Sequence, residues 1–201
     1  MEIADTYTTI LTPGEGLYKE KGSKFISIAT AVQDEQDFKE QMIGIKKRFY
    51  DARHHCYAYR LGLEDGVFRS SDDGEPSGSA GKPILNQIYS YEMYHTVVVV
   101  VRYFGGTKLG VSGLVNAYKT AARESLDNAK TEVRFLTDLL QISCDYSHVD
   151  QLMRFVREEE LKVVHQKFEM NCALQVEVKK SLTENILEKL GFWHEIVVSK
   201  L

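Results

Sequence analysis

The sequence predicts an α+β protein of two domains, and three patterns in its 201 residues carry that prediction. An unbroken apolar run, Val97 to Val101, is typical of a central strand that is buried on both faces. Apolar residues at helical spacing over Val111 to Asn128 predict an amphipathic helix that closes the first domain. A complete strand and helix pattern restarts after this helix, so we expect domains at residues 1–130 and 131–201.

The segments before the valine run predict strands and two helices. Residues Thr6 to Leu11 and Lys24 to Val32 are rich in Thr, Ile and Phe, which favours strands separated by the Thr12-Pro13-Gly14 turn. Asp34 is suited to cap a helix whose C-terminal end carries Lys46-Lys47-Arg48, since cations favour that end of the helix dipole. Further strands are expected at His54 to Leu61 and Val67 to Ser70, with a turn at Glu64-Asp65-Gly66 and a helix from Pro83 to about Tyr91.

The second domain follows the order βαββαβ, which is the ferredoxin-like arrangement. Each element is read from alternating or helical apolar spacing. We expect strands at 133–144, 161–168, 171–178 and 193–198, and helices at 148–159 and 182–190.

Composition excludes several classes of protein. The formal net charge is −4 and 27% of the residues are charged, so the chain is neither a disordered tail nor a generally basic nucleic-acid binder. Any contact with nucleic acid must therefore be local. The acidic start, Met1 to Asp5, lacks a signal sequence, and Val97 to Val101 is far short of the ~20 apolar residues that span a bilayer. We expect a soluble, cytoplasmic protein with no membrane partner.

The cysteines, Cys56, Cys144 and Cys172, are odd in number and widely spaced. Each lies in a segment that resembles a strand. We expect reduced, partly buried thiols rather than a disulfide framework or a zinc site.

The first of two unusual loops runs from Asp72 to Pro83. Its part Gly78-Ser79-Ala80-Gly81-Lys82-Pro83 leads into a predicted helix, where free backbone N–H groups can bind an anion. Pro83 stands where a P-loop needs Ser or Thr, which disfavours a nucleotide triphosphatase. A weaker site for an RNA phosphate or a phosphorylated metabolite stays open, beside the alternative that the glycines only form a tight turn.

Three carboxylates, Asp72, Asp73 and Glu75, lie within four residues of this first loop. They could hold Mg²⁺ or supply a catalytic acid, whereas the alternative is a plain Asp-Gly turn with local caps. His54 and His55 supply a second segment, and strand alternation sends them to opposite faces. We expect one histidine to be packed in the strand and the other to face the loops as an acid, a base or a phosphate contact.

The second loop, Arg102 to Gly110, closes the buried strand and opens the strongest helix. It offers cations at Arg102 and Lys108, two aromatic residues, and glycines that include Gly105 and Gly106, a mixture that suits phosphate contact and base stacking. The alternative places the aromatic rings in the core and leaves the glycines to form the turn. Lys108 is harder to explain by structure alone, because a cation near a helix N-terminus opposes the dipole.

These two loops resemble the defining runs of the IMPACT (YigZ-type) family. The pattern Asp-Asp-Gly-Glu-Pro-x-Gly-[Ser/Thr]-Ala-Gly-x-Pro matches at Asp72 to Pro83, and Arg-Tyr-[Phe/Tyr]-Gly-Gly-x-Lys-Leu-Gly matches at Arg102 to Gly110. The resemblance extends from about Lys21 to Leu126. It implies a cytoplasmic, translation-linked protein whose N-terminal domain is similar to the fourth domain of elongation factor G, a ribosomal-protein-like βαβ fold, and whose second domain is similar to the fifth.

The eukaryotic branch of that family acts in starvation signalling through a protein partner. The present sequence has no counterpart of that branch's N-terminal partner-binding domain, so we do not expect that partner here. A contact with RNA or the ribosome is what the resemblance implies.

Two classes of function follow from these residues. In the first, the protein is a factor that binds RNA or the ribosome, with Gly78, Ser79, Gly81, Lys82, Arg102, Gly105, Gly106 and Lys108 at the phosphate backbone. In the second, it is a metal-dependent hydrolase or phosphotransfer enzyme, with Mg²⁺ on Asp72, Asp73 and Glu75 and with His54 or His55 as base. A module that binds a protein partner is a third, less specific option. We favour the first, because no nucleophile paired with a base is legible in the sequence.

Overall fold

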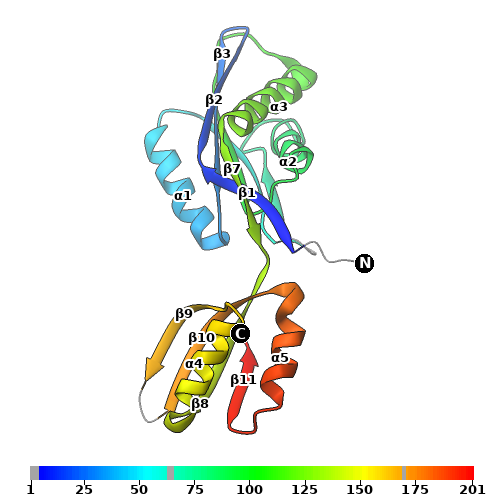
Figure 1. Cartoon of the computed structure of the whole chain (residues 1–201). Helices are drawn as coiled ribbons and strands as arrows, with labels where there is room; N and C mark the ends of the chain where they lie inside the picture. Colours follow the sequence, from blue (N-terminus) through cyan, green and yellow to red (C-terminus); the bar gives the residue numbers. More distant parts are fainter. Residues whose placement is uncertain (1–4, 63–65, 169–170) are drawn as a thin grey trace. The chain divides into compact units, whose positions relative to one another are not determined.

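A five-stranded antiparallel sheet organises the N-terminal part of the computed structural model, which describes residues 5–62, 66–168 and 171–201 (Figure 1). The strand order is β2-β3-β6-β4-β5, and each neighbouring pair is antiparallel. The strands are β2 (Gly14–Glu20), β3 (Ser23–Ala31), β4 (His54–Arg60), β5 (Phe68–Ser71) and β6 (Thr96–Tyr103). The predicted central strand is confirmed, because β6 lies in the middle of the sheet and its valines are buried.

Helices cover both faces of this sheet (Figure 1). α1 (Glu35–Arg48) lies on one face, and α2 (Gly81–Ser90) and α3 (Gly110–Asn128) lie on the other. Alternation along β6 sends Val99 to the core beneath α1, and Val98 and Val100 to the core beneath α2 and α3. Asp34 caps α1 as predicted.

The strand β2 is absent from the sequence prediction, which has a single turn between two strands there. Its sequence, GEGLYKE, contains two glycines and three charges, a composition that disfavours a strand. The glycines are needed because α3 packs directly on the backbone of β2. A Cβ atom at Gly14 would overlap the backbone of Ser125 in α3 and of Ala129, the residue that caps its C-terminal end. Close packing on a helix therefore overrides the local preference.

The predicted strand at 133–144 is two strands, β7 (Lys130–Phe135) and β8 (Thr137–Asp145). β7 forms a separate two-stranded sheet with β1 (Thr6–Thr12). The chain changes partner at Leu136, whose N–H donates to the carbonyl of Asp5 at 2.6 Å. Because β7 pairs with β1, one compact unit contains residues 7–134, and residues 135–201 form the other together with Asp5 and Thr6. That the two parts fold independently stays a prediction.

The C-terminal unit has the predicted βαββαβ order. Its sheet has the order β11-β8-β10-β9, and two helices pack on one face of it. Leu140, Leu174 and Val176 of the sheet lie in one core with Leu152 and Ile186 of the helices. The elements besides β8 are α4 (Val149–Glu158), β9 (Lys162–Phe168), β10 (Asn171–Lys179), α5 (Thr183–Gly191) and β11 (Ile196–Lys200).

All three cysteines are free thiols in the buried interior of their units, as predicted. Cys144 of β8 and Cys172 of β10 are directly opposite each other in the ladder, and burial raises the pKa of both. None of the helices in the described part of the chain is long and apolar enough to span a membrane. The expected turn at Glu64-Asp65-Gly66 falls largely outside the described residues.

Candidate functional site

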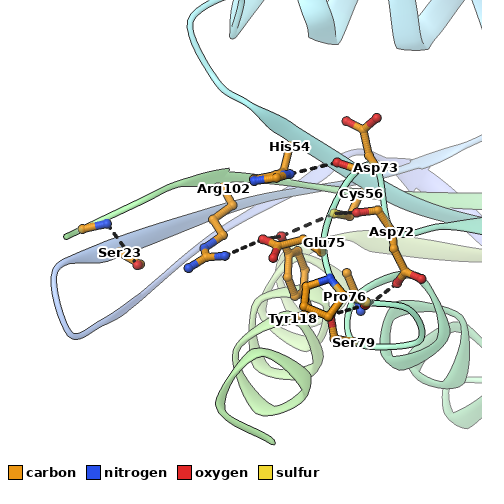
Figure 2. A network of polar contacts seen from close by, with 12 residues as sticks. Ser23, His54, Cys56, Asp72, Asp73, Glu75, Pro76, Ser79, Arg102 and Tyr118 are labelled. Atoms are coloured by element: carbon orange, nitrogen blue, oxygen red, sulfur yellow. Dashed lines mark hydrogen bonds and ion pairs between the residues drawn. The ribbon is translucent and has the colours of Figure 1, made fainter. Parts of the chain in front are cut away.

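The first and second loops meet at a buried ion pair (Figure 2). Arg102 Nη1 donates to Glu75 Oε1 at 2.6 Å, and the side chains are only 7% and 4% exposed. The guanidinium group of Arg102 also lies near the rings of Phe25 and Phe104. Two buried charges of opposite sign compensate each other only while both are present. The pair therefore fixes the first loop against the end of β6.

The ion pair continues into a chain of polar contacts that ends in the core. The Tyr118 hydroxyl donates to Glu75 Oε1 at 2.9 Å and lies 3.3 Å from the Cys56 sulfur. The Cys56 thiol in turn lies 3.0 Å from the carbonyl of Asp72, to which it donates. Burial raises the pKa of Cys56 to about 12 and also raises the pKa of Tyr118. Both groups are therefore neutral hydrogen-bonding side chains and not nucleophiles at neutral pH.

Asp72 occupies the anion site that the glycine-rich part of the first loop forms. Its carboxylate accepts hydrogen bonds from the backbone N–H groups of Gly78, Ala80 and Gly81 at 2.8–2.9 Å. α2 begins at Gly81, so Pro83 is the third residue of the helix and not the first as predicted. The prediction that the N–H groups of Gly78 and Gly81 are free to bind a phosphate is thus wrong, because a carboxylate of the same loop already fills their site.

Replacing Asp72 with asparagine is expected to lower the free energy of unfolding by about 1–2 kcal/mol near neutral pH, because a neutral amide oxygen accepts weaker hydrogen bonds from the three N–H groups than a carboxylate does. Burial alone would raise the pKa of Asp72, but the N–H groups of Gly78, Gly81 and Ala80 outweigh it and lower the pKa. The stabilisation is therefore complete above the unfolded pKa of ~3.9 and is lost as the pH falls through the native pKa.

Urea unfolding of the wild type and the variant at about pH 7 and about pH 3 checks this pH dependence. The difference in free energy of unfolding between wild type and variant should be large at the higher pH and smaller at the lower pH. An equal difference at both pH values would show that the charge on Asp72 contributes nothing.

Asp73 and the two histidines form a second set of contacts. The carboxylate of Asp73 accepts the backbone N–H of His55 at 2.7 Å, and the backbone carbonyl of Asp73 lies 2.8 Å from His54 Nδ1. The His55 ring is buried beside the end of α1, with Nε2 lying 3.1 Å from the carbonyl of Phe49. His54 is thus the histidine that faces the first loop, and His55 is the packed one.

The three carboxylates of the first loop point to three different places (Figure 2). Asp72 binds backbone N–H groups, Asp73 binds the backbone of β4, and Glu75 binds Arg102 and Tyr118. No group of three or more His, Cys, Asp or Glu side chains in the described ranges is arranged to hold a metal ion. This arrangement gives no support to the alternative of a shared Mg²⁺ site on the cluster, because each carboxylate binds a separate partner.

The second loop lies against the turn between β2 and β3. The N–H of Gly105 donates to the Ser23 hydroxyl at 3.1 Å, and the backbone of Gly105 packs on Gly22. Gly106 has a φ of 87°, which turns the chain toward α3. Lys108 is exposed just before α3, as is Phe104, whose side chain is 57% exposed. The alternative that placed the Phe104 ring in the core does not hold.

The lysines of the β2–β3 hairpin are site candidates that the sequence prediction missed. Lys19 and Lys24 are directly opposite each other across the two strands, and Lys21 lies in the turn. All three are exposed. The lysine-rich run Lys-Glu-Lys-Gly-Ser-Lys is visible in the sequence. Because the strand β2 was not predicted, this run was not recognised as the turn of a hairpin. We call Lys19, Lys21, Lys24, Phe104 and Lys108 the loop-end surface.

The remaining predicted site residues lie elsewhere. The Ser79 hydroxyl is buried and donates to the carbonyl of Pro76 at 2.6 Å, so it serves the turn. Lys82 is exposed on α2 and lines a groove that faces α3. Arg102 is buried beneath Phe104 and is not placed to contact a phosphate directly.

Comparison with known proteins identifies the family. The model of the Impact N-terminal domain matches residues 21–126, a range that contains both loops. The chain belongs to the IMPACT family. It is 35% identical over 178 residues to the IMPACT family member YvyE of Bacillus subtilis, covering 88% of this chain and 82% of that protein. It is 29% identical over 173 residues to YigZ of Escherichia coli, with 85% of each chain covered.

A solved structure supports the fold of the whole chain. This crystal structure of a hypothetical protein superimposes with a TM-score of 0.77 at 25% identity, covering 99% of this chain and 98% of the other. The two-domain α+β architecture of this IMPACT family member is thus found in an experimental structure.

Proposed function

We propose that this IMPACT family protein is a cytoplasmic, translation-linked factor that binds RNA, on its own or in the ribosome, through the loop-end surface. Four lysines and one exposed aromatic ring come from two segments that lie at the same end of the N-terminal unit (Figure 1). Lysines supply phosphate contacts, and an exposed ring supplies a platform on which a base can stack.

The observation that carries the proposal is the pairing of Lys19 with Lys24. Like charges directly opposite each other on neighbouring strands destabilise a sheet. In the described part of the chain neither lysine forms an ion pair, and the same holds for Lys21 and Lys108. Grouped exposed lysines without ion-pair partners repel one another and contribute little to the stability of the fold. An anionic partner explains why these charges are grouped.

The proposal predicts that RNA affinity depends on salt and on the loop-end surface. A labelled single-stranded RNA should bind with an affinity that falls steeply as salt increases, and each of Lys24→Ala and Lys108→Ala should make the slope shallower by about 0.7. Replacing Phe104 with alanine should weaken binding roughly tenfold, since it removes one stacked base. Fluorescence anisotropy at two salt concentrations measures both effects, and cosedimentation tests binding to ribosomes.

Lys39→Ala is the matched control, because Lys39 is an exposed lysine of α1 on the other face of the sheet. It should leave the affinity and the salt slope unchanged. If Lys39→Ala weakens binding as much as Lys108→Ala, the contact is non-specific charge attraction. If the wild type shows no binding that depends on salt, the proposal is wrong.

A further inference from the structure

The groove between α2 and α3 is separate from the loop-end surface. It forms a half-open pocket of about 270 Å³, lined by residues that include Gly78, Lys82, Asn86, Gln87, Val115 and Lys119. This volume lies just below the range of ~300–1,000 Å³ that is common for ligand pockets, so an occupant must be small.

Gln87 gives the groove an unpaired polar group. The residue is only 7% exposed. Its side-chain amide has no hydrogen-bond partner among the residues in the described ranges. Among the described residues, Arg102 Nε is the one fully enclosed side-chain nitrogen or oxygen without a partner. The amide of Gln87 is therefore not sealed in the core but opens into the cavity that it lines. A small molecule bound in this pocket could therefore take the place of water as the hydrogen-bond partner of the Gln87 amide.

The charge around the groove is positive. The described residues that line it include two lysines and no acidic residue. These lysines, Lys82 of α2 and Lys119 of α3, come from opposite helices, and neither has an ion-pair partner in the described part of the chain. Asp72 is the acidic residue bonded to the Gly78 backbone, and its carboxylate accepts hydrogen bonds from three N–H groups.

We propose that this groove binds a small phosphate ester. Lys82 and Lys119 would pair with the phosphate, and the amides of Gln87 and Asn86 would hydrogen-bond the organic part. Charge-assisted hydrogen bonds from two ammonium groups favour the anion, and the amides add selectivity for a partner with donors and acceptors. This inference does not depend on RNA binding, because it uses none of the residues of the loop-end surface.

The test is a titration of the full chain with adenosine monophosphate, followed by amide chemical shifts of Gly78 and Val115. Adenosine, which lacks the charge, and inorganic phosphate, which lacks the organic part, are the comparison probes. We expect saturable shifts with adenosine monophosphate and an affinity at least tenfold weaker for adenosine. Lys82→Ala and Lys119→Ala should each weaken binding of adenosine monophosphate about tenfold, while Lys39→Ala leaves it unchanged.

Gln87→Leu keeps the size of the side chain and should weaken binding of adenosine monophosphate but not of phosphate. If this variant fails to fold, Asn86→Ala, at an exposed position, tests the other amide contact to the organic part. The inference is overturned if no shift saturates by ~10 mM or if adenosine binds as well as its phosphate ester. It is also overturned if Lys24→Ala and Lys108→Ala abolish binding of adenosine monophosphate. Failure of the wild type to bind RNA would instead count against the proposed function alone.

Discussion

Replacing Glu75 with glutamine is expected to destabilise the N-terminal unit by about 3–5 kcal/mol, because it leaves the buried charge of Arg102 without compensation. Glutamine has nearly the same size, so the loss reflects charge rather than a cavity. Chemical unfolding at neutral pH measures the change. Removing the other partner, in Arg102→Met, should have a similar effect. It leaves the carboxylate of Glu75 buried, with the Tyr118 hydroxyl as its remaining hydrogen-bond donor.

The ion pair of Arg48 with Glu15 is the matched control in the same unit. It joins two side chains that are about half exposed. Glu15→Gln should cost less than about 1 kcal/mol, because water and salt screen an exposed pair. The interpretation fails if Glu75→Gln costs no more than Glu15→Gln. In the double variant Glu75→Gln/Arg102→Met, part of the stability should return, because neither charge is then left alone.

Replacing Gly105 with alanine is expected to cost about 3 kcal/mol or more, a value at the upper end for overpacked sites. The added Cβ would overlap the backbone of Gly22 and Ser23, which has no flexible side-chain end that could move aside. The β2–β3 turn must therefore shift away from the second loop. We also expect weaker RNA binding, because the same shift moves Lys21 and Lys24.

Gly44→Ala gives a control of opposite sign. Gly44 lies in α1, and nothing within 4 Å would meet its Cβ. Alanine there should stabilise the protein by roughly 0.5–1 kcal/mol through helix propensity. If Gly105→Ala unfolds at the same urea concentration as the wild type, the close approach of the second loop to Gly22 is not a constraint on the fold.

Elements with a clear apolar period could be predicted from the sequence. This holds for the five valines of β6, for the apolar stripe of α3 and for the order of the C-terminal elements. In each case the spacing of apolar residues is compatible with only one type of element, because the buried face must be apolar. The two loops could also be recognised. They contain more charged, hydroxyl-bearing and glycine residues than a simple turn requires.

The partners within the loops could not be predicted. Asp72 and Glu75 are three residues apart and equally acidic, yet one caps α2 and the other binds Arg102, which is 27 residues away in the sequence. Only the folded arrangement of β4, β6 and α2 decides between a metal site and three separate contacts. The strand β2 was missed for a related reason. Its glycines are required by the close packing of α3, which the local sequence does not reveal.

The reactivity of the three cysteines can be used to measure how often each unit unfolds. Thiol reagents attack the thiolate, and burial with a raised pKa keeps Cys56, at about 12, and Cys144, at about 11, protonated and covered in the native state. Reaction at these positions must then wait for local or global unfolding, so its rate follows the opening equilibrium of the surrounding structure. Cys56 reports on the N-terminal unit, and Cys144 and Cys172 report on the other. The unmodified protein thus allows the stability of its two halves to be followed separately, without an added label.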